Sequence, residues 1–384
     1  MYEVIKSWLK KRTESPSKKT STQTLIDFDV LFLSSSSVDE VWIRSTALAS
    51  KSVGLNVAIA ICDSSEGLPD TIDCYRLANI PFFDKLSFSE AAEIQCRIAV
   101  TASSGLDRSI FPTPALWFIH MPHSIASLHM IYDENAFSGY DALFSVGPHH
   151  DEEYREICER LSLENRFSLP VGYGKLDEMR RIFAISIDYP TNVKTVEDRL
   201  HVLLAPSWGP DNLLDRLGEE LIQALVHKGY EVTIRPHPLF FIERPPIMEA
   251  LTKLSNELAT VTLESSLNGN NAVFSADLLI GDYSGTSFEF HALRGKPVIS
   301  VDVGLKIVNE NWRQYTARPI EISLRDKLGR VVEPDITKIV EAAESLFQET
   351  NNSMTSIVKQ FLHSPPGECA DRAVHHLKQL LLKP

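Results

Sequence analysis

Short apolar runs alternate with segments of helical periodicity along most of the chain. In the first half, residues 30–33 and 56–61 form apolar runs, and residues 38–51 between them show the spacing of an amphipathic helix. Runs that are apolar at every position are typical of strands buried on both faces of a parallel sheet. The strand–helix–strand order therefore predicts parallel pairing through a right-handed crossover. Further strands are expected at 97–102, 115–120 and 142–146, and a helix from about 151 to 161.

The same alternation starts again after a polar interruption. Residues 185–199 hold no apolar period, so we expect a domain boundary near residue 190. The pattern predicts a separate segment 1–24, a first α/β domain 25–190 and a second α/β domain 191–384, whose last helix (369–382) packs back on the first. Strands of the second domain are expected at 201–205, 230–234, 260–263, 278–280 and 298–301, with helices at 246–258 and from 336.

The stretch 277–302 has the clearest pattern: a strand, a tight turn, a helix and a strand. In open parallel sheets, ligands bind at the carboxyl ends of strands, where this turn lies. The polar side chains of the turn and the first helical residues are Asp282, Ser284, Thr286 and Ser287, with Gly285 among them. Hydroxyls beside the free N–H groups of a helix N-terminus predict a phosphate-binding site. The alternative is an ordinary helix cap formed by Asp282 or Ser284.

Composition narrows the class of protein. The chain of 384 residues carries a net charge of -13, which argues against a general nucleic-acid binder. Its 5 cysteines are scattered without a CxxC pair, so neither a disulfide framework nor a zinc cluster is expected, and a reducing cytosol fits. The sequence shows no apolar run of the length needed to span a bilayer and no signal peptide.

The segment 1–24 differs from the rest in charge. It holds Lys6, Lys10, Lys11, Arg12, Lys18 and Lys19, against only Glu3 and Glu14. Ile5, Trp8 and Leu9 can share one helical face. A basic amphipathic segment of this kind predicts peripheral attachment to an anionic membrane surface on its cytoplasmic side. A solvated, frayed terminus is the alternative.

Histidines gather after the strand expected at 115–120. The run IHMPHSIASLHMIY contains His120, His123 and His129, in a position where active-site loops lie. A histidine there can act as a general base, because its pKa lies near operating pH. The alternatives are hydrogen bonds to backbone and, more weakly, a metal site. His149 and His150, which open the next helix, are expected to be exposed.

A second charged turn, RPHP, follows the strand expected at 230–234. Its two prolines fix the loop around His237, and Arg235 and His237 could both contact phosphate at this strand end. A rigid turn with incidental charges is the alternative. No metal ligands of the DxD kind are evident, so no metal is expected.

Taken together and in order, these segments resemble the CDP-glycerol glycerophosphotransferase family, which includes the teichoic-acid polymerases and primases. The similar segments are PHS (122–124), VGYGKLDEM (171–179), LLAPSW (203–208), RPHP (235–238), the stretch 277–299 and GECADRAVHHL (367–377). The resemblance covers about residues 110–380. Three departures stand out: Ser124 replaces Gly, Gly174-Lys175 replaces Pro-Arg, and Gly285 replaces the second Ser of a Ser-Ser pair.

The resemblance implies a GT-B architecture, with two Rossmann-like domains facing across a cleft. It implies transfer of a phospho-polyol, glycerol phosphate first, from a CDP-activated donor to a hydroxyl of a lipid-linked or polymeric glycan, in teichoic acid or capsule synthesis. His123 would be the general base, and Arg235 and His237 would contact the pyrophosphate. Ser284, Gly285, Thr286 and Ser287 would hold the donor phosphates, Asp282 would orient the turn, and Trp208 would pack near the base or ribose.

No cofactor beyond the nucleotide donor is expected. A GT-B glycosyltransferase using a nucleotide sugar is the first alternative, since the same phosphate site would serve it. A nucleotide-sugar epimerase and a non-catalytic binding module are the others.

Overall fold

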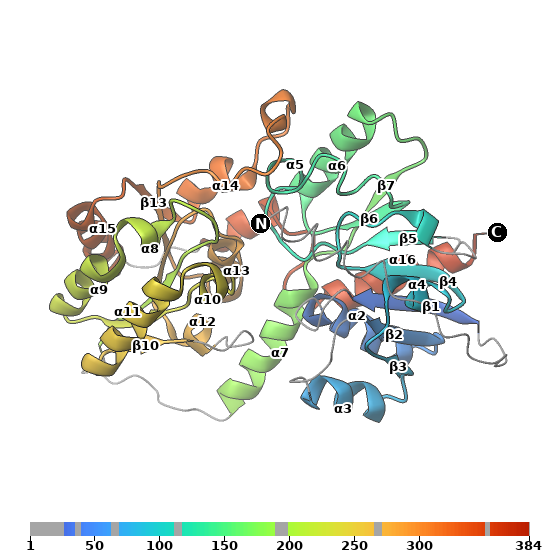
Figure 1. Ribbon diagram of the computed structural model, residues 1–384, viewed down its shortest axis with the longest axis horizontal. Coiled ribbons are helices and arrows are strands. Elements are labelled where there is room, and N and C mark those ends of the chain that lie inside the picture. The colour runs from blue at the N-terminus through green and yellow to red at the C-terminus, as the bar shows by residue number, and fades with distance from the viewer. Residues whose placement is uncertain are drawn as a thin grey trace.

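Two parallel sheets, each covered by helices, form two domains that lie side by side (Figure 1). The computed structural model describes residues 27–34, 40–62, 69–110, 117–188, 199–264, 271–349 and 354–383. The basic segment 1–24 lies outside the described residues, and so does most of the expected domain boundary. The predicted α/β class with two parallel sheets is confirmed.

The first sheet has 7 strands in the order β3-β2-β1-β4-β5-β6-β7, all parallel. Its strands are β1 (Phe28–Ser34), β2 (Val57–Ile61), β3 (Phe82–Phe83), β4 (Cys96–Thr101), β5 (Trp117–His120), β6 (Ala142–Ser145) and β7 (Phe167–Pro170). The central strand β1 pairs with β2 on one side and β4 on the other. Strands β2 and β3 therefore extend the sheet on one side of β1, and β4 to β7 extend it on the other. Ligand sites of such sheets lie beyond the carboxyl ends of the strands.

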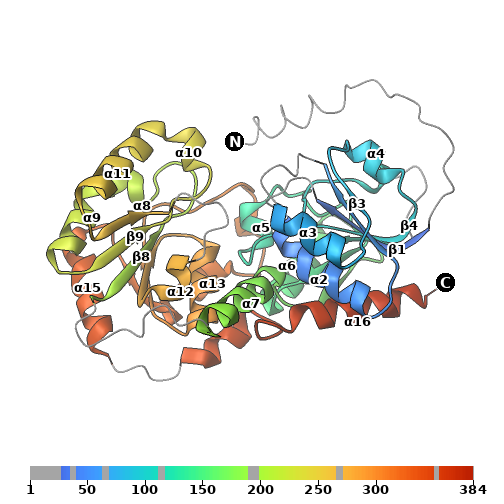
Figure 2. The same cartoon turned by 90° about the horizontal axis from the view of Figure 1, so that it is seen from below.

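Helices from both ends of the chain cover the first sheet. They are α2 (Glu40–Ser52), α3 (Pro69–Leu77), α4 (Phe88–Ala92), α5 (Leu128–Ile131), α6 (Pro148–Arg160), α7 (Gly174–Asp188) and the last helix α16 (Cys369–Leu381). Although α16 follows the second domain in sequence, it lies along α2 (Figure 2). Its buried Ala373 and Leu377 share a core with Ile43 of α2.

The second sheet has 6 parallel strands in the order β10-β9-β8-β11-β12-β13. Its strands are β8 (His201–Ala205), β9 (Glu231–Ile234), β10 (Val261–Leu263), β11 (Leu278–Gly281), β12 (Val298–Val301) and β13 (Gly329–Val332). Its α-helices are α8 (Leu213–Arg216), α9 (Gly218–His227), α10 (Phe240–Glu243), α11 (Pro245–Glu257), α12 (Asn271–Ser275), α13 (Gly285–Arg294), α14 (Ile320–Ser323) and α15 (Ile336–Gln348). Short 3-10 helices occur at η1 (Arg108–Ile110), η2 (Trp312–Gln314), η3 (Arg325–Lys327) and η4 (Met354–Gln360).

An apolar cluster joins the two domains. Ile125, Tyr173 and Leu176 of the first domain are buried together with Leu279 and Phe288 of the second. Helix α7 lies between the two sheets in both views (Figures 1 and 2). Because apolar burial is the main favourable contribution to packing, this cluster holds the carboxyl ends of β5 and β11 close together.

Three edge strands, β3, β7 and β13, have no counterpart in the sequence-based prediction. β3 has only 2 residues, and no residue of β7 or β13 is fully buried. Edge strands of this kind lack the all-apolar pattern that identifies central strands. Helix α7 also runs to Asp188, beyond the start of the polar segment 185–199. Within the described part of the chain, no helix is long and apolar enough to cross a membrane.

Candidate active site at the domain junction

The loop 121–128, which follows β5, carries His123. The His123 Nδ1 lies 2.9 Å from the carbonyl oxygen of Ala102, so it carries the proton and donates it to that carbonyl. The other ring nitrogen, Nε2, is then an acceptor, and the Tyr132 hydroxyl donates to it at 3.2 Å. An imidazole whose orientation is fixed through Nδ1, with Nε2 as the acceptor, is the arrangement that a general base needs.

The side chains of His149 and His150, in the first turn of α6, bind the backbone of this loop. The prediction that they are exposed is wrong: they are 8% and 0% exposed. Their Nε2 atoms each lie 2.9 Å from a loop carbonyl, those of Ile125 and Ala126 respectively. Burial lowers the pKa of His149 to about 3 and that of His150 to about 4, so both stay neutral at pH 7. They face inward because the first turn of α6 packs under the loop.

The other two histidines of the run do not reach the site surface. His120 is fully buried between Phe137 and Tyr140, and its Nδ1 lies 3.2 Å from the carbonyl of Ser103. Burial lowers the pKa of His120 well below its usual value. His129 is 1% exposed, and its Nδ1 lies 3.5 Å from Glu153 Oε1. Of the three, only His123 is accessible to a substrate.

The segment VGYGK connects the two domains through polar contacts. The Tyr173 hydroxyl accepts a hydrogen bond from Trp42 Nε1 at 2.9 Å and lies 3.1 Å from Glu289 Oε1 of α13. It also lies 3.0 Å from the backbone carbonyl of His123. Lys175 forms an ion pair with Glu289, with its Nζ 2.9 and 2.7 Å from the two carboxylate oxygens.

Gly174 in this segment explains one departure from the family motif. A Cβ atom at Gly174 would lie 2.5 Å from the backbone oxygen of Trp42. A side chain at this position would therefore force the backbone apart, so glycine allows α7 to start close against α2. Lys175 then points toward the junction.

The turn after β11 is shaped by its own polar side chains. Asp282 is 2% exposed, and its carboxylate accepts hydrogen bonds from the backbone N–H groups of Ser207 at 2.7 Å and Leu213 at 3.1 Å. Ser284 is the N-cap of α13, and its hydroxyl accepts from the Thr286 N–H at 3.2 Å. Asp282 therefore orients the loop after β8, and the cap that the sequence allowed as an alternative is present.

The hydroxyls of this turn differ in accessibility. Ser287 is 2% exposed, whereas Ser284 and Thr286 are half-buried. Ser284 and Thr286, together with the N-terminus of α13, are the groups of this turn that a ligand can reach. Helix α13 has 10 residues, long enough to carry the positive end of a helix dipole.

Gly285 brings the turn against the loop of His123. A Cβ atom at this position would lie 3.3 Å from Ile125 Cγ2 and 3.7 Å from Ser124 Oγ. Such a contact is tighter than ordinary packing, so glycine permits the close approach of the two segments. Gly285 and Ser124 are both departures from the family motif, and the structure brings them together.

The RPHP turn after β9 contributes His237. Its Nδ1 lies 3.3 Å from the N–H of Leu239, which donates to it, so the neutral ring carries its proton on Nε2. Burial, with a smaller effect of the nearby Lys175 charge, lowers the pKa of His237 to about 4. His237 is therefore neutral at pH 7 and can donate a hydrogen bond through Nε2.

Arg235 and Trp208, two other predicted site residues of the second domain, have different surroundings. Arg235 Nε lies 3.6 Å from Glu264 Oε2 at the end of β10, so its charge is partly compensated. Trp208 is half-buried in the loop after β8, whose backbone is bound by Asp282. Among the described residues, no hydrogen bond or ion pair joins either side chain to His123 or His237.

Two cations were missed by the sequence-based list of site residues. Lys175 lies where the sequence departs from the family motif, so the resemblance assigns it no role. Lys306, which follows β12, is 5% exposed and donates to the Pro210 carbonyl at 3.3 Å. Burial lowers its pKa despite the nearby Asp282, Asp211 and Asp215. Lys306 lies far from these partners in sequence, so no local pattern could identify it.

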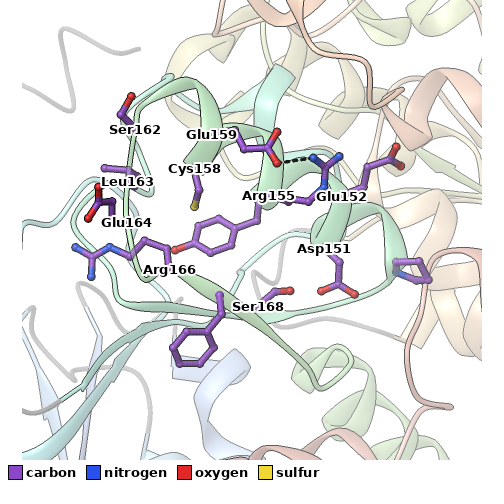
Figure 3. A pocket seen from close by; sticks show the side chains of 13 residues that line it. Asp151, Glu152, Arg155, Cys158, Glu159, Ser162, Leu163, Glu164, Arg166 and Ser168 are labelled. Atoms are coloured by element: carbon purple, nitrogen blue, oxygen red, sulfur yellow. Dashed lines mark hydrogen bonds and ion pairs between the residues drawn. The ribbon is translucent and has the colours of Figure 1, made fainter.

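Within the described ranges, no group of three or more His, Cys, Asp or Glu side chains could hold a metal ion. A pocket of about 920 Å³ lies elsewhere, along α6 and the edge strand β7 (Figure 3). Arg155, Cys158 and Arg166 line it, and Arg155 is paired with Glu159. The pocket contains none of the predicted site residues, so it is separate from the junction.

The two parallel sheets and the site at their junction define a GT-B-like fold with two Rossmann-like domains. No protein-family model matches the chain, and no curated protein sequence matches it significantly. Solved structures do match over nearly the whole length. The wall teichoic acid polymerase TagF is 13% identical, with a TM-score of 0.58, over 92% of this chain and 89% of that chain.

Epimerases share the same fold. UDP-GlcNAc 2-epimerase from Neisseria meningitidis is 11% identical, with a TM-score of 0.59, over 94% of this chain and 100% of that chain. The enzyme from Methanocaldococcus jannaschii is 12% identical, with a TM-score of 0.58, over 92% of this chain and 100% of that chain. At these identities the likeness establishes the fold.

Proposed function

We propose that this protein is a transferase that moves a phospho-polyol, glycerol phosphate first, from a CDP-linked donor to a hydroxyl acceptor. The observation that carries the proposal is the close approach of two segments: Ser124 and Ile125, on the loop that carries His123, lie against Gly285 at the N-terminus of α13. The loop with the proposed base thus lies against the proposed phosphate-binding turn of the other domain. TagF, with the same fold, is a teichoic acid polymerase that was soaked with CDPG.

In the proposed reaction, the acceptor hydroxyl attacks the phosphorus that bears the polyol. A bond forms between that phosphorus and the acceptor oxygen, and the bond to the CMP oxygen breaks, so CMP leaves. The hydroxyl proton passes to His123 Nε2, the ring nitrogen whose partner Nδ1 is bound to Ala102. General base catalysis of this kind contributes about 10²–10⁴-fold in rate.

Charge on the leaving CMP is balanced by groups from both domains. The α13 N-terminus and the hydroxyls of Ser284 and Thr286 hold the donor phosphates. His237 donates a hydrogen bond from Nε2, and Lys175 supplies a positive charge beside it. These donors stabilise the charge that develops in the transition state. Arg235 takes part if the donor displaces its partner Glu264.

The acceptor class we propose is a lipid-linked or polymeric glycan, in synthesis of teichoic acid or capsule. Segment 1–24, with its six lysines and arginines, would attach the protein to an anionic membrane on its cytoplasmic face. Deletion of residues 1–24 is expected to release the protein from the membrane fraction. Full retention of the deleted variant there would contradict this part of the proposal.

A nucleotide-sugar enzyme is the second candidate, because UDP-GlcNAc 2-epimerases share the fold. Calorimetric titration with CDP, CMP, UDP and GDP separates the two. The proposal predicts tightest binding of CDP or CMP, and about tenfold or greater loss in His237→Ala, since one charge-assisted hydrogen bond to phosphate is removed. Preference for UDP or GDP would instead favour a nucleotide-sugar enzyme.

A further inference from the structure

The connection between β12 and β13 leaves the second domain and lies on the first. We call residues 308–321 of this connection the crossing segment; it is the orange chain beside α5 and α6 in Figure 1. The Val308 N–H donates to the Met130 carbonyl at 2.9 Å, and Asn309 Nδ2 donates to the His129 carbonyl at 3.0 Å. The crossing segment is thus bound to α5, the helix directly after the His123 loop.

A second set of bonds ties the crossing segment to α6. The N–H groups of Thr316 and Ala317 donate to the carboxylate of Glu156, at 2.8 and 3.1 Å. In the part of the chain that the structure describes, the hydrogen bonds and ion pairs of Glu156 go to Thr316, Ala317 and Arg155 and not to the loop 121–128, so Glu156 anchors the segment without binding that loop.

Glu321 at the end of the crossing segment binds the loop directly. Its Oε1 accepts the backbone N–H of Ser127 at 2.9 Å and lies 3.4 Å from the Ser127 hydroxyl. Glu321 is 2% exposed, so this bond is shielded from water. A buried hydrogen bond to a carboxylate is among the stronger ones in proteins.

The opposite side of the same loop contacts α13, since Ser124 and Ile125 face Gly285. Both ends of the loop therefore touch the second domain, one through Gly285 and the other through Glu321. His123 lies at the Gly285 end. Its backbone carbonyl is also within 3.0 Å of the Tyr173 hydroxyl, which in turn lies beside Glu289 of α13.

Three groups face the Glu321 carboxylate besides Ser127: the carboxylate of Glu153 on α6, the ring of His129 on α5 and the backbone N–H of Glu321 itself. Burial and then the Glu153 charge raise the pKa of Glu321 to about 7, while the N–H bonds and His129 lower it. Near neutral pH, Glu321 therefore exchanges between a carboxylate, the stronger acceptor for Ser127, and a neutral acid.

We propose that Glu321 is a positioning residue that sets the His123 loop from the opposite domain, so that His123 takes its working position only when the two domains are together. The proposal rests on the proposed function only in naming His123 as the base. The coupling between Glu321 and the loop can be tested without any assay of transfer.

The test is hydrogen exchange at the Ser127 amide, measured in the full chain for wild type, Glu321→Ala and Glu321→Gln. Glu321→Ala removes the acceptor, so exchange is expected to speed up about tenfold or more. Glu321→Gln keeps an amide oxygen in the same position, so most of the protection returns. Glu156→Gln is the matched control, because it changes a buried anchor of the same segment; Ser127 exchange should stay within about twofold of wild type.

Transfer kinetics add a readout that a purely structural role would not change. In Glu321→Ala, kcat is expected to fall about tenfold while the affinity for CMP is retained, since Glu321 touches no donor group. In Glu321→Gln, the pH profile of kcat should lose an ionisation near neutrality that wild type shows. Unchanged Ser127 exchange in Glu321→Ala, or an equal change in Glu156→Gln, would overturn the proposal. If the Glu321 variants change Ser127 exchange as expected but the wild type transfers no phospho-polyol, the proposed function would be contradicted and the role of Glu321 would stand.

Discussion

The two halves of the site are built in different ways. The turn 281–287 of the second domain shapes itself: Ser284 caps α13, and Asp282 binds the backbone of the neighbouring loop. The loop 121–128 of the first domain has few such local contacts and is held by side chains far away in sequence. Hydrogen bonds between the loop backbone and His149, His150 and Glu321 hold it in place.

Under the proposed function, this difference separates the segment that binds the donor from the segment that carries the base. A turn that carries its own cap keeps its shape whether or not the domains meet, so the donor site is expected to be preformed. A loop held from α6 and from the other domain keeps its shape only in the assembled junction. The position of His123 is therefore sensitive to changes far from it, whereas the shape of the turn 281–287 is not.

The largest expected effect is on the loop side. His123→Ala removes the base, so kcat should fall about 10²–10⁴-fold while CMP affinity stays within about twofold. Steady-state kinetics and calorimetry measure the two quantities. Tyr132→Phe is the matched control, because it removes only the hydroxyl 3.2 Å from Nε2 and should cost less than tenfold. Near-normal turnover in His123→Ala would exclude it as the base.

The next effect concerns the contact between the two halves. Lys175→Met leaves Glu289, whose side chain is 5% exposed, without its cationic partner. The free energy of unfolding should fall by about 3 kcal/mol, since breaking a buried pair from one side strands a charge. The pKa of His237 should rise, because the Lys175 charge helps to lower it. Chemical denaturation and proton NMR titration measure these changes.

The double variant Lys175→Met/Glu289→Gln serves as its control. With the carboxylate also neutralised, most of the lost stability should return, while the rise in the His237 pKa should persist. A double variant as unstable as Lys175→Met alone would mean that the ion pair is not the source of the effect.

On the turn side, Asp282→Ala leaves two buried N–H groups, those of Ser207 and Leu213, without an acceptor. We expect a loss of about 2–4 kcal/mol in the free energy of unfolding, measured by urea denaturation. Ser284→Ala, which removes only the N-cap, should cost about 1 kcal/mol. Equal costs for the two variants would show that Asp282 does not organise the loop after β8.

The smallest effect is a change in how stability depends on pH. The pKa of His149 is lowered from 6.5 to about 3 in the folded protein, so between those values the unfolded chain binds the extra proton. Stability should therefore fall as the pH drops below 6.5, by at most about 1.4 kcal/mol per pH unit for one histidine. His149→Gln keeps a donor to Ile125 but cannot titrate, so its curve should be flatter; an unchanged slope would contradict the account.

The same contrast explains what could be predicted from the sequence. The central strands and the turn 281–287 show their structure in local patterns, all-apolar runs and a capped glycine turn, so their positions were predicted to within a few residues. Edge strands such as β7 are partly exposed on both faces and lack that pattern. His149 and His150 were expected to be exposed, because nothing nearby in sequence shows that α6 packs beneath another loop.

Contacts between residues far apart in the sequence could not be predicted either. The loop histidine His123 could be proposed from its position after a strand, but its contacts with Tyr132 and Ala102 depend on the fold. Lys306 and Glu321 reach the site from segments about 100 and 200 residues away from the groups they bind. Their side chains gain a role only when the two sheets are brought together.

We propose that the junction transfers a phospho-polyol from a CDP-linked donor with His123 as base. The most direct measurement is CMP release from CDP-glycerol, followed with and without a glycerol-phosphate-terminated acceptor, in wild type and His123→Ala. The account predicts release that depends on the acceptor in wild type and falls at least about 100-fold in the variant. No release from CDP-glycerol, together with conversion of UDP-GlcNAc to its C2 epimer, would contradict it.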